Sequence, residues 1–167
     1  MNGNPPYHER QGHFDMMCLI HALNMLLGRQ KMDKRTLDDA CDVLSPNSHW
    51  WNPHRNPLGL GNYDVNVAMW LLQEEGLDVS FFDGRKDARE LPLEHDSMVV
   101  GLLLNVVGSK WIPGSRHWMT YRKQAKVWWK LDSQEKGPIL VERIWEAMSE
   151  HLSKGDHILI VRTRALL

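Results

Sequence analysis

Cysteine is scarce in this chain, which has only two in 167 residues. Cys18 and Cys41 do not make the disulfide framework of a small secreted domain. The first six residues, MNGNPP, lack the basic charge and the apolar run of a signal peptide. We therefore expect a reducing cytoplasmic location, extending to the nucleus, in which Cys18 stays a free thiol.

An excess of one charge and a long apolar run are also missing. Twenty basic residues oppose 21 acidic ones, which gives a formal net charge of −1. No strong field therefore points to nucleic acid or to an anionic membrane. No apolar stretch approaches the roughly 20 residues that span a bilayer, so we expect no integral membrane segment. Without repeats or a long linker, residues 1–167 are predicted to form a single domain.

Apolar periodicity predicts helices mainly in the first half of the chain and strands in the second. Helices are expected over about 16–28, 34–44, 63–75 and 140–153, and strands over 79–82, 98–106, 117–122, 127–131 and 157–161. Asp15 is the expected N-cap of the first helix, and Gly28 its end. Helices followed mostly by strands, without regular crossover helices, indicate an α+β fold in which N-terminal helices pack on a mostly antiparallel sheet.

Three residues have the right order for cysteine hydrolase chemistry. Cys18 is expected at about the third residue of its helix, where the positive end of the backbone dipole stabilises a thiolate. His117 and Asp132 lie on neighbouring predicted strands. A hairpin turn centred on 123–126 would place them directly opposite each other on one face. Asp132 would then hold one ring nitrogen of His117 while the other faces the thiol.

The remaining thiol and imidazole groups have simpler interpretations. Cys41 lies on the apolar stripe of the second helix, which favours inert packing. His21 lies one turn after Cys18 and is expected to be structural, because a neighbour on the same helix cannot easily reach over the thiol. Cys18 and His21 lack the second pair of ligands that a zinc site needs, so we expect neither a metal nor a cofactor. Structural roles for Cys18 and His117 themselves also stay open, since such residues are more often structural than catalytic.

Six segments, taken together, resemble the Josephin family of cysteine deubiquitinases. They are Tyr7–Gln11, Cys18–Asn24, Asn52–His54, Leu58–Val67, Arg116–Trp118 and Leu131–Ser133. Their order covers nearly the whole chain, with an expected core at about 7–162. Residues 61–67 and 131–133 are most similar to the short stand-alone Josephin proteins.

The resemblance implies a papain-like cysteine protease fold and hydrolysis of the peptide or isopeptide bond at the C-terminus of ubiquitin. Carried over by position, Cys18 is the nucleophile, His117 the general base and Asp132 the residue that orients it. Gln11 matches the glutamine of the oxyanion hole. It stands seven residues before Cys18, where the family has five. The insertion either bulges outward and leaves Gln11 in place or moves its amide out of reach, with the Cys18 backbone amide as the remaining donor.

Two other functions stay open beside that of a deubiquitinase. The spacing of Gln11 allows a Josephin scaffold that binds ubiquitin and cleaves it weakly or not at all. The same triad would also serve a hydrolase of another ubiquitin-like modifier, because fold does not determine substrate. If the chain is a deubiquitinase, ubiquitin or its chains are the expected partner. Trp50, Trp51, Trp111 and Trp118 are candidates for the walls of a narrow tail channel, and the oligomeric state does not follow from the sequence.

Overall fold

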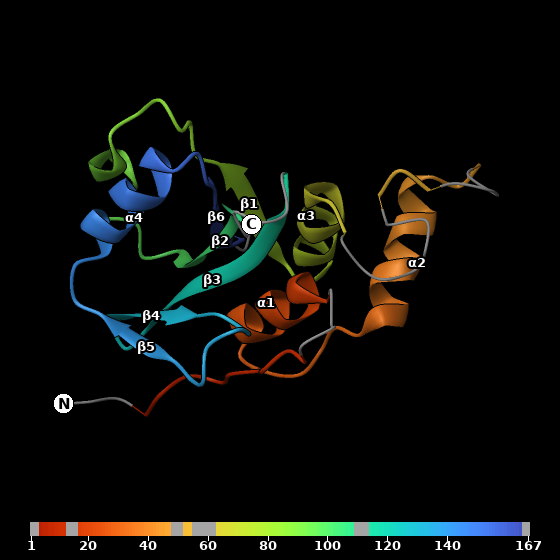
Figure 1. Cartoon of the computed structure of the whole chain (residues 1–167), viewed down its shortest axis with the longest axis horizontal. Helices are drawn as coiled ribbons and strands as arrows, with labels where there is room; N and C mark the ends of the chain where they lie inside the picture. Colours follow the sequence, from red (N-terminus) through yellow and green to blue (C-terminus); the bar gives the residue numbers. More distant parts are fainter. Residues whose placement is uncertain (1–3, 13–16, 48–51, 55–62, 109–113, 165–167) are drawn as a thin grey trace.

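The computed structural model describes residues 4–12, 17–47, 52–54, 63–108 and 114–164 (Figure 1). Its elements, in chain order, are α1 (Cys18–Leu27), α2 (Lys34–Leu44), α3 (Val65–Glu74), β1 (Leu77–Phe81), the 3-10 helix η1 (Ala88–Glu90), β2 (Val99–Val107), β3 (Arg116–Gln124), β4 (Val127–Leu131), β5 (Ile139–Val141), α4 (Ile144–Ser153) and β6 (His157–Thr163). Trp50, Trp51 and Trp111 lie outside the described residues, as does Asp15.

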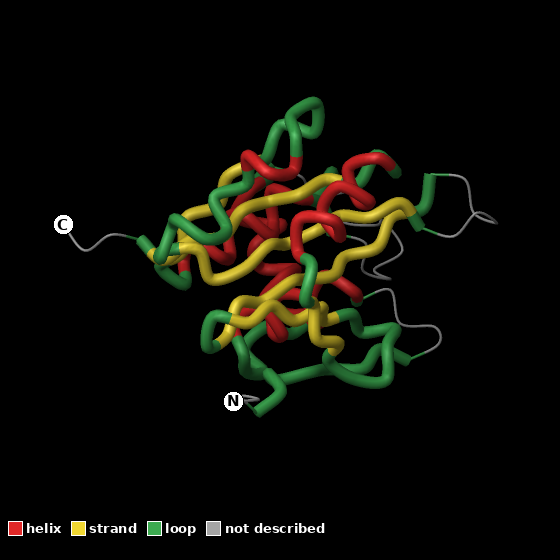
Figure 2. Tube along the Cα trace, turned by 90° about the vertical axis from the view of Figure 1, so that its left-hand side faces the viewer, coloured by secondary structure: helices red, strands yellow, loops and turns green. Residues whose placement is uncertain are grey.

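The described strands form one sheet in the order β1-β6-β2-β3-β4-β5, and every neighbouring pair is antiparallel. The last strand, β6, inserts between the first two, so the C-terminal strand is hydrogen-bonded on both of its edges. Figure 2 shows the sheet as a stack of twisted strands with helices beside it. The predicted α+β fold, with N-terminal helices on an antiparallel sheet, is confirmed.

Side chains alternate along the central strands and supply a core on each face of the sheet. Leu103 of β2 and Leu159 of β6 pack in the cluster formed with α1, α2 and α3. Leu102 and Leu104 of β2 belong instead to a second cluster, which contains residues of η1 and α4. The sheet is therefore buried on both sides, and the face under α1 is the one that contains Cys18.

The helices begin and end where local chemistry favours it. Asp33 caps α2 by accepting from the Thr36 backbone amide at 2.8 Å, and Asp64 caps α3 in the same way. Gly28, with φ of +75°, ends α1 in the left-handed conformation that glycine adopts without strain. The observed bounds of α2 match the prediction, and those of α3 lie within two residues of it.

Two local predictions at the start and end of the chain need correction. Helix α1 begins at Cys18 and its N-cap is Met17, which makes no side-chain cap, so the thiol lies on the first helical residue and not on the third. The helix predicted over 140–153 begins only at Ile144. Its first residues instead form β5, which pairs with β4 at the edge of the sheet.

Asn24 explains the turn that follows α1. It is buried, and its side-chain oxygen accepts from the backbone amides of Lys31 and Met32 at 2.9 and 2.7 Å. Its amide nitrogen donates to the Met32 carbonyl at 3.0 Å. One side chain thus replaces three backbone partners and fixes the path from α1 to α2.

Candidate active site

The structure brings Cys18, His117 and Asp132 together beside the N-terminus of α1. His117 Nε2 lies 2.7 Å from Asp132 Oδ1, and the Cys18 thiol shares a side-chain hydrogen bond with His117. Because the carboxylate holds Nε2, Nδ1 is the ring nitrogen left for the sulfur. All three residues are buried, with exposed fractions of 8%, 9% and 8% respectively.

The predicted register of the hairpin was wrong by two residues, although the two side chains still meet. Strands β3 and β4 pair from Gln124 opposite Val127 to Thr120 opposite Leu131. Asp132 therefore follows the end of β4 and approaches His117 diagonally. A shift of two residues keeps each side chain on its face, whereas a shift of one would have separated them.

Burial and hydrogen bonding shift the pKa values of His117 and Asp132 in opposite directions. Burial by itself lowers the pKa of His117, but hydrogen bonds to Asp132 and Cys18 outweigh it and raise the pKa to about 9. Burial disfavours the charged form of Asp132, yet His117 and the Gln134 backbone amide hold the pKa of that carboxyl below its ordinary value. The arrangement therefore favours the imidazolium form of His117 beside the carboxylate of Asp132.

The segment before α1 runs past the β4–β5 side of the sheet toward α1 (Figure 1). Gln124 donates to the Asn4 carbonyl at 3.0 Å, and His8 Nε2 lies 3.0 Å from the Asp132 carbonyl oxygen. Further along, the Gln11 backbone amide donates to the Ser133 carbonyl at 2.9 Å. We call residues 4–12 the N-terminal strap.

Gln11 is hydrogen-bonded to Ser133, the residue that follows Asp132. The Ser133 hydroxyl donates to Gln11 Oε1 at 2.9 Å, and Ser133 is fully buried. With its oxygen engaged, the amide of Gln11 has a set orientation. The longer spacing between Gln11 and Cys18 thus leaves Gln11 joined to the segment that contains Asp132.

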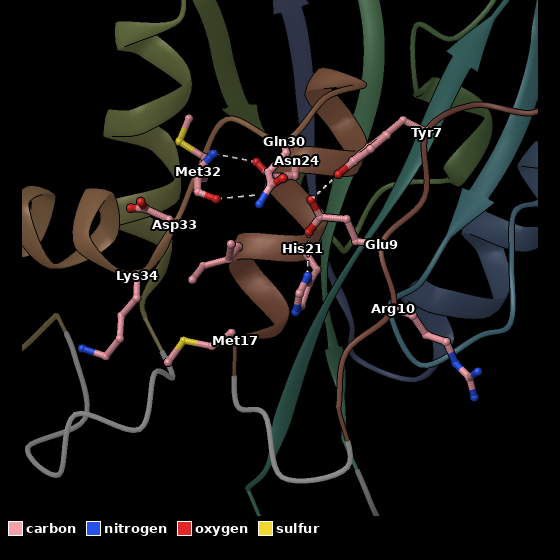
Figure 3. A pocket seen from close by; sticks show the side chains of 11 residues that line it. Tyr7, Glu9, Arg10, Met17, His21, Asn24, Gln30, Met32, Asp33 and Lys34 are labelled. Carbon is pink, nitrogen blue, oxygen red and sulfur yellow. Dashed lines mark hydrogen bonds and ion pairs between the residues drawn. The ribbon is translucent and has the colours of Figure 1, made fainter.

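A second pair joins the strap to α1. His21 Nδ1 lies 2.6 Å from Glu9 Oε2, and the Tyr7 hydroxyl donates to Glu9 Oε1 at 2.7 Å. Figure 3 shows Glu9 and His21 facing each other between strap and helix, while Arg10 points away from them. His21 therefore ties the strap to the helix that begins at Cys18, which agrees with the structural role expected for it.

Cys41 and Trp118 also have defined surroundings. Cys41 is fully buried and its sulfur lies 3.7 Å from the His54 carbonyl oxygen, as expected for packing.

Trp118 is buried, and its indole nitrogen donates to the Tyr63 carbonyl at 3.3 Å. A cavity of about 460 Å³ lies beside it. The described lining residues are Tyr63, Asp64, Val65, Phe81, Asn105, Arg116, Trp118, His157 and Leu159.

Within the described ranges, no group of three or more His, Cys, Asp or Glu side chains lies close enough to hold a metal ion. None of the helices in the described part of the chain is long and apolar enough to cross a membrane.

The family model named Josephin matches residues 13–162. This chain belongs to the Josephin family. The match includes Cys18, His117 and Asp132, whereas Gln11 lies just before it. Helices α1, α2 and α3 pack on one face of the antiparallel sheet and α4 on the other. With the Cys18 thiol at a helix start and His117 on a strand, this arrangement is the papain-like fold that the resemblance implied.

Individual Josephin proteins are similar over most of this chain. The Josephin-like protein of Drosophila melanogaster is 40% identical over 140 residues, which cover 79% of this chain and 61% of that protein. Josephin-2 of Homo sapiens is 40% identical over 143 residues, or 81% of this chain and 73% of that protein. A Josephin-like protein of Arabidopsis thaliana is 36% identical over 76% of this chain and 38% of its own length. The chain thus spans less than two thirds of the fly relative.

Sequence reasoning missed several residues that shape this Josephin site. Ser133 and Gln134 contact Gln11 and His117, and Glu9 pairs with His21. These contacts join segments far apart in the sequence, and no periodicity marks them. The one feature of the sequence that could have pointed to Glu9 and Ser133 is their position. Both lie beside candidate site residues, within the segments that resemble the Josephin family.

Proposed function

We propose that this Josephin chain is a thiol-dependent deubiquitinase that hydrolyses the peptide or isopeptide bond at the C-terminus of ubiquitin. The observation that carries the proposal is the Cys18–His117–Asp132 arrangement, with 2.7 Å between the imidazole and the carboxylate. In this proposal Cys18 is the nucleophile, His117 the general base and acid, Asp132 the orienting residue and Gln11 an oxyanion donor. Residues 1–167 act as a single catalytic domain.

The reaction proceeds through an acyl-enzyme. The Cys18 thiolate attacks the terminal glycine carbonyl, and the oxygen of the tetrahedral intermediate accepts hydrogen bonds from the Cys18 backbone amide and the Gln11 side chain. The carbon–nitrogen bond then breaks while His117 donates its proton to the leaving amine. His117 next takes a proton from water, which attacks the thioester and releases ubiquitin with a free C-terminal carboxylate.

Membership of the Josephin family supports ubiquitin as the substrate. A deubiquitinase must accept an extended tail that ends in two glycines, which suits a narrow path beside a flat aromatic side chain. The cavity of about 460 Å³ beside Trp118 is a suitable approach for that tail. A reducing compartment, the cytoplasm or the nucleus, would keep Cys18 as a thiol.

The proposal is tested by reaction with a ubiquitin whose C-terminus is an electrophile. The parent protein is expected to form a covalent adduct, Cys18→Ala to form none, and His117→Ala to react more slowly. Cys41→Ala is the matched control, because its sulfur is buried in the core, and it should react like the parent. Labelling of Cys18→Ala at the parent rate would show that the nucleophile is another residue.

The same proteins separate the two alternatives left open by the sequence. A binding scaffold would bind ubiquitin and give neither adduct nor turnover. The hydrogen bond between Ser133 and Gln11 favours an active enzyme, because it keeps Gln11 joined to the Asp132 segment. Electrophilic derivatives of other ubiquitin-like modifiers would identify a different modifier, if one reacts faster than ubiquitin.

A further inference from the structure

A second cavity lies beside the candidate triad, on the side of the N-terminal strap. Its volume is about 570 Å³, and its described lining residues are Arg10, Gln11, Gly12 and Gln134. Gln134 Nε2 lies 3.5 Å from His117 Nδ1, so this cavity opens next to the ring nitrogen that is not held by Asp132. It is separate from the cavity beside Trp118, with which it shares no described lining residue.

Proton transfer determines which part of the substrate belongs in this cavity. When the thiolate attacks, the sulfur–carbon bond forms and the carbon–nitrogen bond breaks. The leaving lysine nitrogen then needs one proton, and the imidazolium supplies it. His117 Nε2 is engaged by Asp132 at 2.7 Å, so that proton comes from Nδ1. The leaving group must therefore lie on the side of Nδ1, where Gln134 and Gln11 line the cavity.

We propose that the cavity lined by Arg10, Gln11, Gly12 and Gln134 receives the lysine-containing segment of the modified protein, and that Arg10 selects for acidic residues next to that lysine. This inference rests on the proposed function, since it names the leaving-group side of the same reaction. The acyl side, with the ubiquitin tail, lies toward Trp118.

The charge of the cavity comes from Arg10. It is exposed, and it is the one charged side chain among the described residues that line the cavity. The neighbouring Glu9 is turned toward His21 at 2.6 Å, and Figure 3 shows the Arg10 side chain directed away from that pair. The guanidinium is thus available to a carboxylate on the substrate, and its fixed positive charge repels lysine or arginine at the same place.

The test uses ubiquitin joined through its C-terminus to the lysine side chain of short peptides, with aspartate, alanine or lysine on both sides of that lysine. We expect kcat/KM at low salt to rise from the basic to the acidic peptide, by about two- to five-fold for each charge that contacts Arg10. Added salt should reduce the difference, because exposed charges are screened. Arg10→Glu should reverse the order of the peptides.

Arg143→Glu is the matched control, since Arg143 is an exposed arginine at the N-cap of α4, on the helix that packs against the other face of the sheet. This variant should keep the parent's preference. Equal kcat/KM for the three peptides in the parent would overturn the inference, and so would a preference that survives in Arg10→Glu. A ubiquitin derivative with a small uncharged leaving group separates the two proposals. If the parent fails to cleave it, the proposed function falls, and this inference falls with it.

Discussion

Asp132 makes a hydrogen bond to His117 that an asparagine could also make, but it adds a full negative charge. That charge matters because the site is buried, where a nearby opposite charge stabilises an ionised group most strongly. Cysteine hydrolases are known with asparagine in the orienting role. The carboxylate is therefore best understood as extending the pH range of the imidazolium rather than as indispensable for orienting the ring.

The first prediction follows from the His117 pKa of about 9. In the parent, kcat/KM for a ubiquitin substrate should fall with a midpoint near pH 9, as His117 loses its proton. In Asp132→Asn we expect that midpoint to move down by about one to two pH units, while activity near neutrality persists. A pH profile of both proteins measures this, and an unchanged alkaline midpoint would show that Asp132 does not hold the proton on His117.

The same pairing affects stability with a definite sign. The pKa of His117 is raised from 6.5 in the unfolded chain to about 9 in the folded one. Its contribution to the free energy of unfolding is fully present below pH 6.5 and is lost as the pH rises through about 9. Urea unfolding of the parent at several pH values should show this loss, and Asp132→Asn should show a smaller one.

The second prediction concerns Gln11 as an oxyanion donor. Gln11→Ala should lower kcat for ubiquitin cleavage by about 100- to 1000-fold, because the developing negative charge loses a donor. Ser133→Ala should cause a smaller loss, since the Gln11 amide stays but loses the hydrogen bond that orients it. Alkylation of Cys18 by iodoacetamide forms no oxyanion, so its rate should stay near that of the parent. Full turnover in Gln11→Ala would assign the oxyanion hole to other groups.

At the scale of elements, the N-terminal strap connects the helix and the sheet that supply the proposed triad. It is tied to α1 by Glu9 and His21 and to the end of β4 through Gln11 and Ser133. Through these contacts the strap connects the helix that begins at Cys18 to the segment that contains Asp132. The pairing of Glu9 with His21 should therefore affect catalysis through the position of Gln11.

The third prediction tests that coupling. Glu9→Ala should lower kcat by about ten- to a hundred-fold with little change in KM, because a displaced catalytic group loses its alignment. Glu9→Gln keeps an acceptor for His21 and should recover most of the activity. Combined with Gln11→Ala, Glu9→Ala should add little further loss, as expected for residues that act as a unit. Independent losses that multiply would mean that Glu9 acts without Gln11.

Element boundaries also show which features could be predicted from the sequence. Apolar periodicity predicted the bounds of α2 and β4 to the residue. The turn between β3 and β4 was misplaced because Ala125 and Lys126 occupy it with positive φ of 51° and 67°. Such turns usually contain Asn-Gly, so an Ala-Lys pair gave no signal. Strand β5 was missed because a short apolar run before a helix looks like part of that helix.

The candidate site was predictable to a different degree. Cys18, His117 and Asp132 could be selected because each stands in a recognisable motif, and their meeting needed only the correct face of a hairpin. The contacts of Glu9, Ser133 and Gln134 could not be foreseen. They depend on where the strap crosses the sheet, which is a property of tertiary packing and leaves no local pattern.

For the whole molecule, the sheet divides the buried core into two clusters, one on each face. Strand β2 lies in the middle of the sheet and gives Leu103 to the cluster that contains Cys18, and Leu104 to the cluster that contains residues of α4. Both leucines are fully buried. Loss of either side chain should therefore reduce stability to a similar extent, but only Leu103 lies in the cluster that contains Cys18, the proposed nucleophile.

The fourth prediction follows from this division. Leu103→Ala and Leu104→Ala should each lower the free energy of unfolding by about 2–5 kcal/mol, as expected for a cavity in a packed interior. At a temperature where both variants remain folded, Leu104→Ala should keep the parent's kcat for ubiquitin cleavage. Leu103→Ala should lower kcat, because α1 can relax into the cavity and move Cys18 relative to His117. Urea unfolding measures the loss of stability, and initial rates on the same samples measure the loss of activity. An equal loss of kcat in both variants would contradict the prediction, because packing on either face would then affect the site equally.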